Sequence, residues 1–216
     1  MKAFIIALFL LMLHQAGYPQ QGTEPYEDTQ VNPENLRKAN PWWQVYSFTA
    51  GAWFPQSNLG VLGVHPAIGV TGAYRNAIHE IDLELSFRFI RTPGDYLVER
   101  GDSLYSLHYY LGGHIGLGYT RYVFFSRRWE FGPHIGIGYD GFDIANDDGS
   151  GNYDYLSPIE INSFDYNLGM RFHFYFKDGT FLGLVPKYHF LHYANQGGSS
   201  LFGNAFSVDL QIGGMP

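Results

Sequence analysis

The feature that most constrains the fold is a strict alternation of apolar and polar residues between Ser163 and Phe176. Every second residue in this run is large and apolar, namely Phe164, Tyr166, Leu168, Met170, Phe172, Phe174 and Phe176. Such a period of two predicts a β-strand with one apolar and one polar face. The run is longer than the usual strand of about 5–6 residues and reaches the about 9–11 residues that cross a bilayer as a tilted strand. It therefore predicts a transmembrane β-strand.

The same alternation recurs along the rest of the chain. Together with 163–176, the predicted strands cover 44–54, 66–75, 79–91, 104–122, 129–142, 180–193 and 205–213. Short turns are expected at 76–77, 125–128 and 177–179, and longer loops at 56–65, 92–103, 143–162 and 194–204. Transmembrane barrels alternate short periplasmic turns with longer extracellular loops. The fold prediction is all-β, an eight-stranded antiparallel up-and-down transmembrane β-barrel with both termini in the periplasm.

The residues before the first strand predict export. Lys2 precedes a short apolar run, 3–13, which is typical of a secretory signal peptide and too short to span a bilayer as a helix. The following stretch is polar, rich in Pro, Asn, Gln and acidic residues, and has neither hydrophobic period. The predicted organisation is a signal peptide at 1–16, a periplasmic linker at 17–42 and the barrel at 43–216.

Composition excludes several classes of function. Charged residues make up 15% of the chain and aromatic residues 18%, and the formal net charge is −7. An acidic chain argues against nucleic acid as a partner, because such proteins carry a basic surface. The absence of cysteine excludes disulfides, a thiol nucleophile and a lipid-modified cysteine. We expect no cofactor and a monomeric protein.

The direction of the two faces separates a membrane barrel from a soluble lipocalin-like carrier. An eight-stranded interior is just wide enough to be filled by side chains, so it could not hold the large apolar faces of all the strands. The polar faces are also rich in glycine, which suits a crowded lumen. Aromatic residues near strand ends suggest interfacial girdles; they include Trp53, Phe54, Tyr122, Trp129 and Tyr193. Pro133 and Pro186 should each mark a bulge or a missing ladder bond.

The polar faces place ionisable residues in the predicted lumen. These are Glu80, Asp82, Glu84, Arg88, Glu130, Asp140, Asp165, Arg171, Lys187 and Asp209. Buried charges must be paired or hydrogen-bonded, so these residues predict a salt-bridged filling of the barrel. A narrow ion path or a binding cavity is the alternative. The histidines of the same faces are His108, His114, His134, His173 and His189. Because no His-x-His pair lies on one face, we predict no metal site.

The whole pattern resembles a known group of membrane proteins. A signal peptide, eight amphipathic strands and the segment Gly-Ala-Trp-Phe-Pro-Gln-Ser-Asn-Leu-Gly at 51–60 are similar to the small outer-membrane β-barrels of Gram-negative bacteria, in particular the porin-like barrels of Bacteroidota. The resemblance implies a location in the outer membrane, contact with lipopolysaccharide and phospholipid, and insertion by the barrel assembly machinery. It implies a structural, binding or narrow-pore role.

A local resemblance supplies the rival hypothesis of an enzyme. His192-Tyr193-Ala194-Asn195 is similar to the His-x-Ser-Asn motif of outer-membrane lipid A 3-O-deacylases, in which the His activates the Ser and a Glu on the last strand orients the His. Here the nucleophile position is Ala194, which has no hydroxyl to activate, and the last predicted strand has no Glu. His192 and Asn195 are the candidate catalytic residues, and the sequence favours a protein without catalytic activity.

Overall fold

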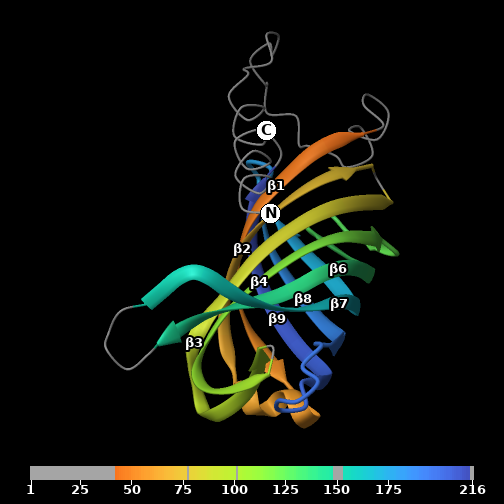
Figure 1. Cartoon of the computed structure of the whole chain (residues 1–216). Coiled ribbons are helices and arrows are strands. Elements are labelled where there is room, and N and C mark those ends of the chain that lie inside the picture. Colours follow the sequence, from red (N-terminus) through yellow and green to blue (C-terminus); the bar gives the residue numbers. More distant parts are fainter. Residues whose placement is uncertain (1–41, 77, 101, 148–152, 215–216) are drawn as a thin grey trace.

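The protein is a closed antiparallel β-barrel of eight long strands. The structure, a computed structural model, describes residues 42–76, 78–100, 102–147 and 153–214. The long strands are β1 (Trp43–Pro55), β2 (His65–Arg75), β3 (His79–Arg100), β4 (Ser103–Arg121), β6 (Trp129–Asp147), β7 (Tyr153–Tyr175), β8 (Thr180–His192) and β9 (Phe202–Gly214). Each pairs with the next in the chain, and β1 pairs with β9 to close the barrel (Figure 1). The predicted fold class is confirmed.

Two smaller elements and the connections distinguish the two mouths of the barrel. The first and last strands pair as Tyr46↔Gly214, so the barrel starts and ends at the same mouth. Short connections join the strands there, at 76–78, at 122–128 around β5 (Phe124–Phe125), and at 176–179. We call this mouth the short-turn end. The opposite mouth, the long-hairpin end, carries the 3₁₀ helix η1 (Ser57–Leu62) and the segment 193–201 between β8 and β9.

Two connections predicted as long loops are largely strand. Within 92–103, β3 continues to Arg100 and β4 begins at Ser103, with an irregularity in the pairing between Arg91 and Tyr96. Within 143–162, β6 continues to Asp147 and β7 starts at Tyr153. The loop prediction was wrong in both places because the two strands of a hairpin keep pairing with each other after they leave the barrel wall. Among the described residues, no helix has the length and apolar character needed to cross a membrane.

The outer surface of the barrel is a belt of exposed apolar side chains. Phe48 on β1 is 75% exposed, Phe164 on β7 70% and Ile212 on β9 64%. Soluble monomers rarely expose contiguous apolar patches above a few hundred Å². The polar residues of the same strands are buried inside, so the barrel has its apolar face outward.

Part of the predicted aromatic girdle lies on the wrong face. Phe54 and Trp129 are exposed on the outer surface, as the girdle requires. Trp53, Tyr122 and Tyr193 are buried inside the barrel, each at most 2% exposed. Their position near strand ends suggested an interface, but residues of a strand alternate between faces, and these three fall on the inward set.

Both strand prolines coincide with interruptions of the ladder, as predicted. Between the pairs Thr120↔His134 and Phe124↔Phe131 the register changes by one residue, which places Pro133 at a bulge. Between β7 and β8 the described pairing stops at Gly169↔Lys187 and resumes at Phe172↔Leu184, which leaves Pro186 in the gap. Proline has no N–H to donate, so a ladder must be interrupted where it faces a neighbour.

Candidate functional site

The lumen is the polar interior of the barrel. The structure places all of the charged residues assigned to it by sequence there, each at most 8% exposed: Glu80, Asp82, Glu84, Arg88, Glu130, Asp140, Asp165, Arg171, Lys187 and Asp209. Inward side chains from every strand meet across the narrow interior, so residues far apart in sequence become neighbours. They form three clusters along the barrel axis.

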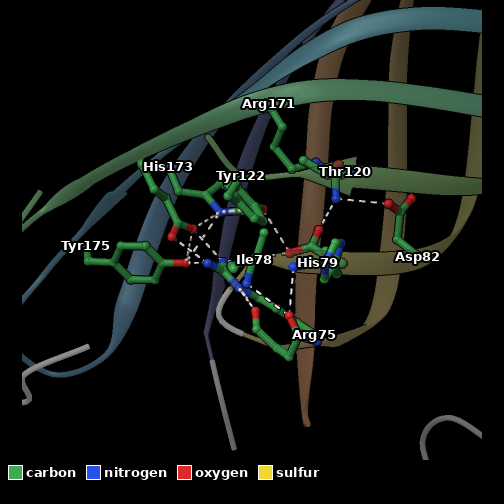
Figure 2. Close-up of polar contacts among 12 residues, drawn as sticks. Arg75, Ile78, His79, Asp82, Thr120, Tyr122, Arg171, His173 and Tyr175 are labelled. Carbon is green, nitrogen blue, oxygen red and sulfur yellow. Dashed lines mark hydrogen bonds and ion pairs between the residues drawn. The ribbon is translucent and has the colours of Figure 1, made fainter. Parts of the chain in front are cut away.

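The cluster nearest the short-turn end is organised by Arg171. Its guanidinium contacts the carboxylate of Glu80 and donates a hydrogen bond of 2.9 Å to Asp82 (Figure 2). The Tyr122 hydroxyl donates to Glu80 at 2.9 Å. Thr120 contacts His134 at 3.0 Å from the neighbouring strand. Two carboxylates thus share one buried cation, and one of them also accepts a hydrogen bond from a phenol.

Arg75 belongs to the same cluster and was missed from the sequence. Its guanidinium binds both carboxylate oxygens of Glu130 and stacks 4.1 Å above the ring of Tyr122. Glu130 also accepts hydrogen bonds from Tyr175 at 2.6 Å and contacts His173 at 3.0 Å (Figure 2). Arg75 is the last residue of β2 and was not assigned to either face from the sequence. Its inward position could have been predicted, because Arg75 lies two and four residues after Ala73 and Thr71 on the same strand, and both of these also point inward.

The central cluster is built on one lysine. The Lys187 ammonium lies 2.7 Å from the carboxylate of Glu84 and 3.0 Å from that of Asp209, and all three side chains are buried. These residues come from β8, β3 and β9. An amine between two carboxylates is compensated by two opposite charges, which offsets much of the cost of removing it from water.

The third cluster lies toward the long-hairpin end. Arg88 pairs with Asp140, and the Tyr193 hydroxyl donates to the same carboxylate. The Arg88 guanidinium also lies 4.6 Å above the ring of Trp53. Cation–π and carboxylate contacts together hold this cation between the polar lumen and an aromatic layer.

Asp165 extends the third cluster through histidines. Its carboxylate lies 2.8 Å from Nδ1 of His189 and accepts a hydrogen bond of 3.0 Å from Asn167. His114 lies between Asp165 and Asp140, with Nδ1 at 3.6 Å and 3.5 Å from their carboxylates. His114 therefore connects Asp165 and His189 to the pair of Arg88 and Asp140.

The histidines do not converge on a metal. His114, His134, His173 and His189 are buried in the lumen, where each contacts a carboxylate or hydroxyl. His108 lies near the long-hairpin end, 3.9 Å from Asp95. Within the described part of the chain, no group of three or more His, Cys, Asp or Glu residues is arranged to hold a metal ion.

An apolar cluster covers the lumen at the long-hairpin end. Its buried residues, the cap cluster, are Trp53, Leu59, Leu62, Tyr96, Val98, Tyr110, Phe142, Ile161, Leu191, Tyr193, Leu201 and Ala205. They come from the barrel strands, from η1, from the outer part of β3 and from the segment 193–201, which gather at the lower end of the barrel in Figure 1. The sequence did not predict this cluster, because its residues were assigned separately to loops, to strands and to the membrane interface.

The two candidate residues of the deacylase-like motif lie in different surroundings. His192 is exposed on the outer surface, and its ring packs 5.0 Å from that of Phe202. Asn195 points to the β3 backbone instead, donating to the Leu97 carbonyl at 2.9 Å and accepting from the Glu99 N–H at 3.0 Å. The last strand, β9, has no Glu. Asn195 thus fastens the segment 193–201 to β3.

Comparisons with known proteins agree with the architecture. No protein-family model and no curated protein matches the sequence. A major outer membrane protein from Thermus thermophilus is 12% identical, with 80% of this chain and 99% of that chain covered at a TM-score of 0.52. Neisserial surface protein A is 9% identical over 81% of this chain and 95% of that one, with a TM-score of 0.48. At 12% identity the likeness to the Thermus thermophilus protein shows the fold alone, which is that of an outer-membrane β-barrel protein.

Proposed function

We propose that the chain is an integral outer-membrane protein whose barrel is closed to solutes and holds its long hairpins at the cell surface, where they serve a structural or binding role. The observation that carries this proposal is the filled interior. Charged residues in contact with one another occupy the lumen, and the cap cluster covers it at the long-hairpin end. A narrow pore, the other role open from the sequence, would need a water-filled path past both.

The exposed apolar belt supports the membrane location. A closed barrel satisfies all inter-strand backbone hydrogen bonds and leaves no edge in lipid, where each unsatisfied group would cost several kcal/mol. In this proposal lipopolysaccharide and phospholipid surround the belt, and the barrel assembly machinery inserts it as a monomer. The short-turn end faces the periplasm, since short turns are typical of that side. The signal peptide at 1–16 and the linker at 17–42, apart from Trp42, lie outside the described residues, and they and the Bacteroidota assignment stay predictions.

Four measurements test this proposal. The purified protein should need detergent to stay in solution and should migrate differently in gels before and after heating. In planar bilayers it should add no conductance steps, whereas a general porin inserted in the same bilayers provides the positive control. Reproducible steps would favour the narrow pore, and a product that dissolves without surfactant would favour the lipocalin-like carrier. Incubation with lipid A should release no 3-hydroxy fatty acid.

A further inference from the structure

The short-turn end carries basic side chains that have no acidic partner. Arg121 ends β4, Arg127 and Arg128 form the turn before β6, and Lys177 follows β7, and all four are exposed. None of them makes an ion pair with a residue in the described ranges, whereas Arg171 and the other luminal cations each contact carboxylates. We call these four residues the basic patch. Unpaired exposed cations are available to a negatively charged partner.

Aromatic side chains border the basic patch on the outer surface. They form two groups of contacting rings, which we together call the aromatic row: Phe124, Phe131 and Phe172 in one, and Trp129, Phe174 and Phe176 in the other. Ring centroids are 4.9 Å apart for Phe124 and Phe131, 4.7 Å for Trp129 and Phe174, and 5.3 Å for Phe174 and Phe176. Trp129 is 54% exposed and Phe176 46%. Aromatic side chains are enriched at this depth because their rings suit the headgroup region of a bilayer.

Backbone contacts hold the basic patch against the aromatic row. The Arg128 carbonyl accepts a hydrogen bond of 2.8 Å from the Tyr175 N–H, which brings the turn at 127–128 beside Phe176 and Lys177. The turn also adjoins Trp129, and Lys177 directly follows Phe176. Asp178 is the acidic residue next to the patch, and its carboxylate already accepts hydrogen bonds from Thr180. The cations therefore remain uncompensated at the edge of the apolar belt.

We propose that this surface binds an anionic phospholipid of the periplasmic leaflet. The basic patch would contact the headgroup phosphate, and the aromatic row would pack on the glycerol region and the first part of the acyl chains. Arginine suits phosphate because its planar guanidinium donates two parallel hydrogen bonds. The proposal rests on the proposed function, since it requires the short-turn end to lie at a membrane interface. It adds the chemical class and the leaflet of the bound lipid.

Trp129 provides a direct probe of this site. The protein would be reconstituted in vesicles of phosphatidylcholine containing brominated phosphatidylglycerol or, in parallel, brominated phosphatidylcholine. The quenching due to Trp129 is the tryptophan fluorescence quenched in the unchanged protein minus that quenched in the Trp129→Phe variant. We expect brominated phosphatidylglycerol to quench more strongly at equal mole fraction, and added salt to reduce the difference. Arg128→Gln should lower the relative affinity for phosphatidylglycerol about fivefold, as expected for one cation near an anionic surface.

A matched control distinguishes lipid binding at this site from a general effect of the protein's positive charges. Arg91 is also exposed and lies on β3 toward the other end of the barrel. Arg91→Gln should leave the preference of the Trp129 site for phosphatidylglycerol unchanged. Equal quenching by both brominated lipids, or equal effects of Arg91→Gln and Arg128→Gln, would overturn the proposal. Absence of quenching by either lipid would instead contradict the membrane location, so the two failures can be told apart.

Discussion

Buried cations in the lumen are each held by carboxylates, and Arg171 is the clearest case. Its side chain is 1% exposed and contacts both Glu80 and Asp82. Arg171→Gln should lower the free energy of unfolding by about 3–5 kcal/mol, because it leaves two carboxylates buried without their cation. Arg121→Gln, at an exposed and unpaired position, should change it by less than about 0.5 kcal/mol. Urea unfolding in detergent micelles measures both, and similar losses would show that the luminal pairing contributes little.

One titratable group outside the barrel wall can be followed directly. Hydrogen bonds from the Thr180 hydroxyl and N–H lower the pKa of Asp178 below its usual 3.8. A carboxylate with a lowered pKa stabilises the folded state above its unfolded pKa, and this contribution is lost as the pH falls through the folded pKa. Thr180→Val should raise the pKa of Asp178 toward the usual value, and Thr180→Ser should not. A carboxyl NMR titration from about pH 6 to about pH 2 measures it; no change in Thr180→Val would exclude the hydroxyl as the cause.

At the scale of one strand, the inward and outward faces of β7 tolerate different changes. Leu168 is 54% exposed on the outer surface, and Leu168→Arg should cost about 2–4 kcal/mol if it lies at the middle of the bilayer. Charged side chains on this face lose hydration when the barrel inserts. The measurement is urea unfolding in lipid vesicles. A change below about 0.5 kcal/mol would mean that Leu168 lies at the interface or in water.

Glycine on the inward face has a different constraint, which is space. A Cβ atom at Gly169 would lie 2.4 Å from the Pro186 carbonyl oxygen, whereas one at Gly113, on the outward face of β4 opposite Phe87, would have nothing nearer than 3.9 Å. Gly169→Ala should therefore destabilise the barrel by about 1–3 kcal/mol, because the backbone of β8 must shift. Gly113→Ala, the control, should have little effect. Equal unfolding midpoints for the two variants would show that β8 adjusts freely at Pro186.

Strands in the barrel wall could be predicted closely because each separates lipid from a polar interior. The interval 44–54 was predicted for β1, which spans Trp43–Pro55. The same signal fails where a strand leaves the wall: Pro93 and Gly94 suggest a loop, yet they lie inside β3. Outside the bilayer neither face of a strand needs to be apolar. The strands of a hairpin can therefore pair there without an alternation of apolar and polar residues in the sequence. The boundaries of β3, β6 and β7 at the long-hairpin end were missed for this reason, whereas the predicted start of β4 at 104 lies one residue from Ser103.

At the scale of the whole molecule, alternation assigns residues to the interior but does not determine their partners. Arg88 was placed in the lumen from its parity, but its contact with Asp140 depends on the tilt and register of strands that are far apart in sequence. The cap cluster was missed for a related reason. Its members come from η1, from the segment 193–201 and from inward positions of the wall, and no local pattern connects Leu62 with Tyr193 or Leu201.

The cap cluster and the membrane-embedded wall should open separately. Leu62 is fully buried in the cap cluster, away from the lipid-facing belt. Leu62→Ala removes apolar contacts there and should lower the local opening free energy by about 2 kcal/mol or more, which corresponds to about 30-fold faster amide exchange. The affected amides should include Ser199, which donates to the Leu97 carbonyl at 2.8 Å. Amides in the paired middle of β8 and β9 should exchange as before.

Hydrogen exchange of the barrel in micelles, followed by mass spectrometry, tests this separation. Leu117→Ala is the control, since Leu117 is 55% exposed on the outer surface and its truncation removes apolar area from the wall alone. It should leave exchange in the segment 193–201 unchanged. If Leu62→Ala accelerated exchange equally in the cap and in the wall, the two would be one cooperative unit. The closed lumen would then depend on the whole barrel, and could not be opened at the long-hairpin end by changes confined to the cap.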